Sequence, residues 1–227
     1  MSLHGSFLSL HSALFTSEPR RAAKGEDAPA SSPFFLGGTD AEYAASGIPE
    51  RQKTQCHWLG VWNDETEVDG FLSSVETHIP RLREAKKFWG LKLIPYMRRG
   101  AEIFPIVVGD TKPEREEPIV IITSIGPYSR EIDAAVAGQR ASYARGTLSQ
   151  ADGLLQELVL IPYPPTDLFT VTAWANERAA QAWAYRSESH RSAIDFHKKA
   201  SEKARVSFTR CRIDETFGDW KHRSRVP

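Results

Sequence analysis

Residues 170–204 read TVTAWANERAAQAWAYRSESHRSAIDFHKKASEKA and combine a strand, a capped helix and a second helix in one stretch. The segment from Phe169 to Trp174 is rich in β-branched and aromatic residues, which favours a strand. Asn176 is a good helix N-cap, and helix-forming residues follow it as far as Arg186. Two serines then interrupt the pattern, and a second helix is expected from about His190.

The second helix presents an apolar face that carries two histidines. Helical periodicity places these residues on one side: His190, Ala193, Ile194, His197, Ala200, Ser201 and Ala204. A buried histidine is either a hydrogen-bonded core residue or a metal ligand. The sequence has no HExxH motif and no second histidine four residues away, which argues against zinc on this helix. A single axial histidine below a flat cofactor is compatible with the pattern.

The same elements occur earlier in the chain at a constant offset. The pairs Trp62 and Trp174, Phe71 and Trp183, and His78 and His190 are each 112 residues apart. Three matches at one spacing indicate an internal duplication. The second half follows the order β-α-β-β-α-β of a ferredoxin-like, split βαβ sandwich, whose sheet needs cover on its second face. The sequence therefore predicts an α+β protein in which two fused ferredoxin-like repeats form a dimeric α/β barrel-type fold around a central cavity.

The expected organisation has two halves joined by a linker. The N-terminal half spans 1–97 with an irregular loop at 17–32, the linker spans 98–118, and the C-terminal half spans 119–227 and carries the histidine helix. Further strands are predicted at 7–13, 58–62, 91–97, 119–125, 154–163 and 206–213, and helices at 64–72, 78–88 and 129–145. Residues 40–55 are ambiguous, and residues 34–36 are expected to dock the preceding loop on the core.

The composition narrows the class of protein. The 227 residues carry 29 Lys and Arg against 29 Asp and Glu, which gives no reason to expect a nucleic-acid or anionic-membrane partner. Two cysteines cannot form a disulfide framework, so reduced thiols are expected. No apolar run is long enough to span a membrane, and the first residues lack the basic region of a signal peptide. A cytoplasmic protein is therefore expected.

Several motifs resemble those of the spheroidene monooxygenase family. The segment FTVTAWANERAAQAWAYRSESHRSAI and the later FTRCRIDETFGDW are similar to the C-terminal part of that family, in which a strand ends in Trp and a helix closes on an F-A-Y-R-like motif. An H-R-x-A-I motif and a terminal strand ending near G-x-W follow. The corresponding residues are Trp183–Arg186, His190–Ile194 and Gly218–Trp220. VWNDETEVDGFLSS and KFWGLKLIPYMRRG are similar to the first repeat, so the resemblance covers about residues 57–220.

The resemblance implies an enzyme that uses haem b for the monooxygenation of a hydrophobic biosynthetic substrate. His190 matches the position of the axial iron ligand, and His197 on the same face is the fallback ligand. Arg186, with Trp174 and Trp183, is expected to contact the cofactor. Arg191 and Tyr185 are the catalytic candidates, and Arg191 is also placed to pair with a haem propionate.

Other functions are compatible with the same barrel. It could be a cofactor-free monooxygenase of the antibiotic-biosynthesis type, a haem lyase similar to aldoxime dehydratase, or a non-catalytic ligand-binding barrel. Residues 14–55 depart from the family pattern, because they look too polar and broken to supply the helix and second strand of the first repeat. An incomplete first half would favour a homodimer, whereas two complete repeats can close a barrel within one chain.

Overall fold

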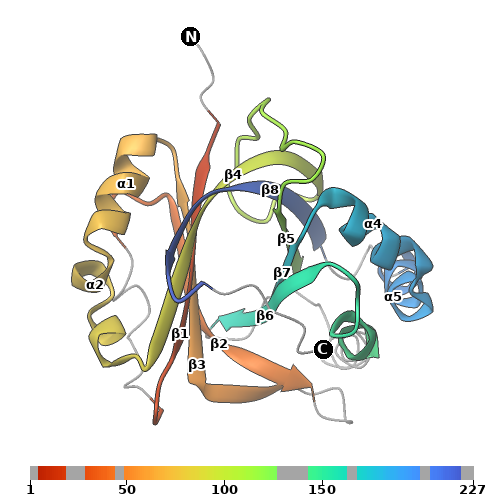
Figure 1. Cartoon of the computed structure of the whole chain (residues 1–227), viewed down its shortest axis with the longest axis horizontal. Coiled ribbons are helices and arrows are strands. Elements are labelled where there is room, and N and C mark those ends of the chain that lie inside the picture. The colour runs from red at the N-terminus through yellow and green to blue at the C-terminus, as the bar shows by residue number, and fades with distance from the viewer. Residues whose placement is uncertain are drawn as a thin grey trace.

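The computed structural model describes residues 5–18, 29–43, 49–126, 143–162, 168–199 and 205–220. Within these ranges eight strands form a closed barrel, with α1 and α2 on one side and α4 and α5 on the other (Figure 1). The elements are β1 (Phe7–Leu14), β2 (Phe34–Tyr43), β3 (Pro49–Trp62), α1 (Glu65–Ser73), α2 (Val75–His78), a 3-10 helix (Pro80–Glu84), β4 (Lys87–Gly100), β5 (Ile119–Gly126), β6 (Leu154–Pro162), β7 (Leu168–Trp174), α4 (Glu177–Arg186), α5 (Glu188–Lys199) and β8 (Arg205–Gly218). None of the helices described is long and apolar enough to cross a membrane.

The strand order confirms the predicted fold class. The barrel runs β1-β3-β2-β6-β7-β5-β8-β4, and every neighbouring pair is antiparallel. The first four strands are therefore arranged β4-β1-β3-β2 and the last four β8-β5-β7-β6, which is the same ferredoxin-like order. Two seams join these sheets. The β4–β8 seam pairs residues from Trp89 to Gly100, whereas the β2–β6 seam, as far as its residues are described, pairs Gly38 with Pro162 and Thr39 with Ile161.

The inner face of the barrel holds the main apolar core. Because side chains alternate along a strand, every second residue of each strand faces inward. The buried members of this core are Leu8, Leu10, Leu59, Val61, Leu91, Leu93, Phe104, Ile106, Val120, Ile122, Leu158, Leu160, Phe169, Val171, Ala173 and Cys211. Phe104 and Ile106 come from the segment after β4 rather than from a strand. The segment predicted as a linker thus supplies part of the core.

The outer face of the barrel is covered by helices in both halves. Phe71 of α1 packs with Trp58 and Trp62 of β3, and Ala180 of α4 packs with Trp174 of β7. Asp64 is the N-cap of α1. Its Oδ1 atom accepts hydrogen bonds from Thr66 N and Glu67 N, which have no partner within the helix. These helices supply the second layer that each ferredoxin-like sheet requires.

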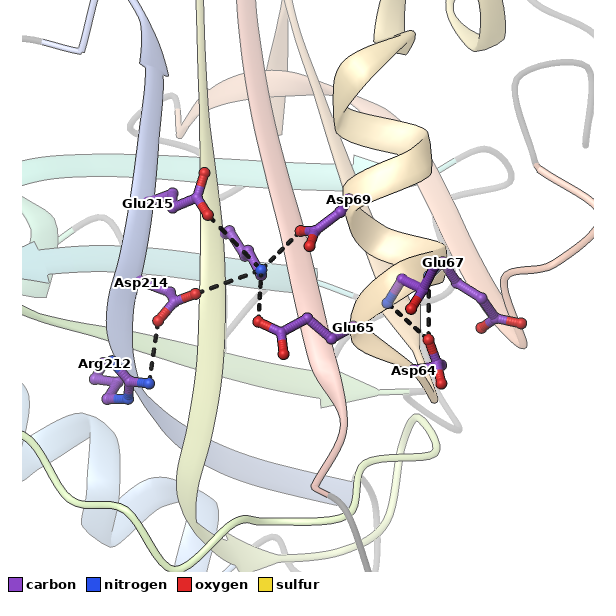
Figure 2. Close-up of polar contacts among 9 residues, drawn as sticks. Asp64, Glu65, Glu67, Asp69, Arg212, Asp214 and Glu215 are labelled. Carbon is purple, nitrogen blue, oxygen red and sulfur yellow. Dashed lines mark hydrogen bonds and ion pairs between the residues drawn. The ribbon is translucent and has the colours of Figure 1, made fainter.

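Lys92 of β4 joins α1 to the barrel (Figure 2). Its side chain is 2% exposed, and Nζ lies 3.0 Å from Glu65 Oε1 and 2.7 Å from Asp69 Oδ1 on α1. Nζ also lies 3.5 Å from Asp214 Oδ2 and 3.8 Å from Glu215 Oε1 on β8. Burial alone would lower the pKa of Lys92, but the hydrogen bonds and charges of Asp69 and Glu65 outweigh it and raise the pKa. The ammonium therefore stays charged and links a helix to two strands.

His11 of β1 is buried beneath α1 without polar contacts. Its ring lies 5.4 Å from the ring of Phe71 in an edge arrangement and 5.8 Å from that of Phe88 in a stacked one. Gly90 faces it on β4, and a Cβ at this glycine would lie 2.6 Å from His11 Nδ1. Neither ring nitrogen has a hydrogen-bond partner among the described residues. Burial lowers the pKa of His11 to about 3.

The helix predicted at residues 78–88 is wrong. The α2 helix ends at His78, a 3-10 helix covers Pro80–Glu84, and β4 begins at Lys87. Proline lacks an N–H and disrupts the preceding helical turn. The residues after Lys87 instead pair with both β1 and β8. Tertiary pairing therefore overrides the local helical pattern.

The first half also contains a strand that the sequence did not predict. Residues 34–36 begin β2 rather than docking a loop, and of the ambiguous range 40–55 the described residues 40–43 belong to β2 and 49–55 to β3. The inference that residues 14–55 cannot supply the second strand is therefore wrong. Residues 19–28, where the first helix of the repeat would fall, lie outside the described residues. So does most of the helix predicted at 129–145, although residues 143–148 are helical.

The N-cap of α4 gives a first testable prediction. Asn176 Oδ1 accepts from Ala179 N at 2.9 Å, so Asn176→Ala leaves that donor without its partner. We expect a loss of about 1 kcal/mol in the free energy of unfolding, measured by urea denaturation. Asn176→Ser keeps a capping oxygen and should stay close to the wild type. Equal losses in both variants would contradict the capping role.

Candidate functional site

Two aromatic stacks occupy equivalent places in the two halves. In the first, the Phe71 ring lies 4.7 Å from that of Trp62 and 5.3 Å from that of His78. In the second, the Trp183 ring lies 5.8 Å from that of Trp174 and 4.4 Å from that of His190. The three residue pairs that share the sequence offset thus make the same contacts. Each stack runs outward from the end of a strand, through a helix, to a histidine.

The second stack is built by the local sequence after β7. Trp174 ends the strand, is 1% exposed, and donates from Nε1 to Thr172 Oγ1 at 2.9 Å. Asn176 then starts α4, which brings Trp183 over the Trp174 ring about two turns later. The Trp183 Nε1 atom is buried and has no hydrogen-bond partner in the described ranges. Trp183 therefore separates His190 from the barrel wall.

The junction between α4 and α5 positions His190. Ser187 Oγ accepts from His190 N at 3.3 Å, as an N-cap does. The Ser187 hydroxyl lies 2.7 Å from the hydroxyl of Ser189, which lies 2.8 Å from Thr147 Oγ1 in the helical residues 143–148. The sequence predicts only an interruption at these serines and gives no indication of Thr147, which is distant along the chain. The helix α5 accordingly begins at Glu188, two residues before the predicted start.

The His190 ring has one defined tautomer. Nδ1 lies 2.9 Å from the carbonyl oxygen of Ala184, and because a carbonyl only accepts, Nδ1 carries the proton. In the neutral ring Nε2 then holds a lone pair. Burial lowers the pKa of His190, and the hydrogen bond to Ala184 opposes only part of this effect. The imidazole is therefore neutral near pH 7, with one nitrogen able to bind a metal.

The other predicted site residues are not gathered around this ring. Tyr185 is 66% exposed, and Arg186 and Arg191 are also exposed. They lie on α4 and α5 close to His190 in sequence, yet they face solvent. His197 lies in α5, and its side chain is outside the described part of the structure. The structure thus brings together His190, Trp183 and Trp174 but not the predicted polar groups.

The residues present fit haem in one respect. A histidine that binds haem iron does so as a neutral imidazole whose second nitrogen donates to an acceptor, and His190 has such a hydrogen bond. Within the described ranges no three His, Cys, Asp or Glu residues are grouped so that they could hold a metal ion by themselves. Cys56 and Cys211 are buried free thiols, and burial raises the pKa of Cys211. Of the two predicted ligands, His190 is the one whose side chain the structure describes.

Comparison with solved structures supports the fold. An aldoxime dehydratase overlaps with a TM-score of 0.57 at 9% identity, covering 94% of this chain and 82% of the other. An aldoxime dehydratase in complex with butyraldoxime gives 0.56 at 10% identity, with coverage of 93% and 80%. An anthrone oxidase-like protein matches over 93% of both chains at 11% identity, with a TM-score of 0.35 that supports no conclusion. No protein-family model and no curated protein sequence matches the chain.

These overlaps concern architecture alone. The chain shares the dimeric α/β barrel-type fold with the two dehydratases, and this fold carries many unrelated functions in general. The resemblance to the spheroidene monooxygenase family finds no counterpart in the comparisons and stays an expectation. Any more specific function depends on the side chains of the His190 stack.

Proposed function

We propose that the protein is a haem-dependent oxygenase or related oxidoreductase that acts on a small hydrophobic substrate, with His190 as the axial iron ligand. The observation that carries the proposal is the hydrogen bond from His190 Nδ1 to the Ala184 carbonyl, which leaves Nε2 as a lone-pair donor. The lowered pKa of His190 supports it, because only the neutral imidazole binds iron. The position of His190 in the family resemblance agrees with this role.

The residues around His190 would each have a separate part. The Ala184 carbonyl fixes the ring orientation and increases the basicity of Nε2. Trp183 and Trp174 keep water away from the inner side of the imidazole. Arg186 and Arg191 lie at the surface, where guanidinium groups suit the carboxylates of haem propionates. Tyr185 is a hydroxyl donor from the same helix end, and with Arg191 it is the proposed catalytic group.

The cofactor would contribute what the side chains cannot. Haem, when bound, would supply the activation of dioxygen or peroxide, which no side chain provides. The protein would then have to bind an apolar substrate and direct hydrogen bonds to it from its hydroxyl and guanidinium groups.

The duplication provides a matched control for the test. We expect the wild type, expressed with a haem precursor, to show a Soret band that shifts on reduction and on addition of carbon monoxide. His190→Ala should lose the band and the bound haem while retaining the circular dichroism spectrum of the folded protein. His78→Ala removes the imidazole from the equivalent stack and should retain haem at wild-type stoichiometry.

Two results would contradict the proposal. If the wild-type protein takes up no haem on titration, haem is not its cofactor. Equal haem content in His190→Ala and the wild type would show that His190 is a structural histidine held by Ala184.

A further inference from the structure

Three hydroxyl groups meet where α4 ends and α5 begins. Ser187 Oγ lies 2.7 Å from Ser189 Oγ, which lies 2.8 Å from Thr147 Oγ1, and Thr147 Oγ1 lies 3.2 Å from Ser187 Oγ. Ser189 is 3% exposed, whereas Thr147 is an exposed residue of the helical segment 143–148. This hydroxyl cluster therefore connects the start of α5 to a segment that lies far from it along the chain.

The number of hydroxyl protons fixes the direction of these hydrogen bonds. Each hydroxyl has one proton to donate and can also accept. Thr147 donates its proton to the carbonyl oxygen of Ala144 at 2.9 Å, so Thr147 Oγ1 can only accept from the serines. The two shorter contacts then run from Ser187 to Ser189 and from Ser189 to Thr147, both at the usual length for hydroxyl groups. The cluster is therefore a chain of donors that ends at Thr147.

The other end of this chain is His190. Its backbone N–H donates to Ser187 Oγ at 3.3 Å, and its ring is held separately by the Ala184 carbonyl, 2.9 Å from Nδ1. Ala184 belongs to α4 and His190 to α5, so the ring hydrogen bond depends on how the end of one helix lies against the start of the other. The Ser189 hydroxyl fixes that arrangement, because it bridges Ser187 and Thr147.

The equivalent junction in the first half is built without these hydroxyls. At the offset of 112 residues, Ser187 corresponds to Val75 and Ser189 to Thr77. Valine has no hydroxyl, Thr77 is exposed, and no described side chain caps the N-terminus of α2. Both halves nevertheless have the same strand order and matching aromatic stacks. The fold therefore does not require the hydroxyl cluster, and the half that has it is the half that carries His190.

We propose that Ser189 and Thr147 are positioning residues that hold the His190 ring in the orientation needed to bind haem iron. Their hydroxyls fix the first turn of α5, which keeps His190 Nδ1 within hydrogen-bond distance of the Ala184 carbonyl. Groups behind a metal ligand set its tautomer and the orientation of its ring. The role toward iron rests on the proposed function, whereas the effect of the hydroxyl cluster on the ring tautomer belongs to the haem-free protein as well.

The test reads the tautomer of His190 by nitrogen NMR in the haem-free, full-length protein with isotopically labelled histidine. Protonated and unprotonated ring nitrogens have well-separated chemical shifts, and the spectrum of His190→Ala identifies the signals of this residue. We expect the wild type to show one tautomer, protonated at Nδ1. In Ser189→Ala and in Thr147→Val the start of α5 is released, so a second tautomer, protonated at Nε2, should appear.

Two further variants separate positioning from a general loosening of the segment. Thr147→Ser keeps the accepting oxygen and should retain the single tautomer of the wild type. Ser149→Ala removes a hydroxyl that donates to Gly146 O at 3.3 Å, outside the cluster, and should also leave the tautomer unchanged. Because Thr147 is exposed, Thr147→Val should fold even if loss of the buried hydroxyl prevents Ser189→Ala from folding.

Haem affinity is the second measurement. The dissociation constant, obtained by titration of the Soret band, should rise about tenfold in Ser189→Ala, the low end of the range for residues behind a metal ligand. A single tautomer in both Ser189→Ala and Thr147→Val would overturn the proposal, and so would a second tautomer of equal size in Ser149→Ala or an unchanged haem affinity in Ser189→Ala. A wild type that takes up no haem would overturn the role toward iron together with the proposed function, while the NMR result shows separately whether the hydroxyls position the ring.

Discussion

Replacing Lys92 with methionine is expected to lower the free energy of unfolding by about 3 kcal/mol, the low end of the range for breaking a buried ion pair. The variant retains the aliphatic packing of the stem but removes the positive charge between Glu65, Asp69, Asp214 and Glu215. The remaining carboxylates then repel one another. Because Glu65, Asp69 and Glu215 are more than half exposed, water screens part of this repulsion, which is why we expect the lower value.

Urea denaturation at neutral pH measures the loss, and Lys87→Met on the exposed start of β4 is the control. Adding Glu65→Gln and Asp69→Asn to Lys92→Met should recover part of the stability, since it removes two of the repelling charges. The raised pKa means that the lysine stabilises the fold fully below its ordinary value of 10.5 and loses this contribution as pH rises toward the folded value. A Lys92→Met variant as stable as the Lys87→Met control would contradict the role of Lys92.

His11→Leu is expected to protect the protein against acid. The pKa of His11 falls from 6.5 in the unfolded chain to about 3 in the folded protein because of burial. Between these values the unfolded chain binds a proton that the folded protein does not, so lowering the pH favours unfolding. At pH 4 this difference amounts to about 3 kcal/mol. Leucine has no titrating group, and it also removes the two ring nitrogens that lack partners.

The measurement compares urea denaturation of the wild type and His11→Leu at pH 7 and pH 4. All other ionisable groups are common to both proteins, so their contributions cancel in the comparison. The stability difference between the two proteins should shift in favour of the variant by about 3 kcal/mol at the lower pH. Equal acid sensitivity of both proteins would show that another group governs the effect.

The elements with clear local signals were predictable from the sequence. Phe169–Trp174 and Ile119–Ile125 are short, β-branched runs, and both are strands in the structure. The spacing between Trp62 and Trp174 predicted a duplication, and the matching stacks share that spacing. The second half of the chain, where strands and caps are marked locally, agrees best with the prediction.

The misses have a common physical cause, which is that pairing partners lie far away in sequence. Residues 40–43 and 49–55 are mostly polar, so their strands are revealed by the pairing of β2 with β3 and not by a local apolar pattern. Lys92 was missed because its carboxylates come from residues 65–69 and 214–215, which no local pattern connects. The sequence also does not reveal which side chains of α4 are exposed to solvent. Tyr185 follows Trp183 by two residues, yet it faces solvent.

The two seams of the barrel differ in the length of their described pairing. A closed barrel is expected to open first between the two neighbouring strands that share the fewest backbone hydrogen bonds. Between β2 and β6 the described pairing involves Gly38 and Thr39 alone, whereas β4 and β8 are paired along most of their length. Amide hydrogen exchange should therefore detect a sub-global opening at the short seam, with a free energy below that of global unfolding. Such an exchange pattern would make the protein one barrel by topology but two separable units in its fluctuations.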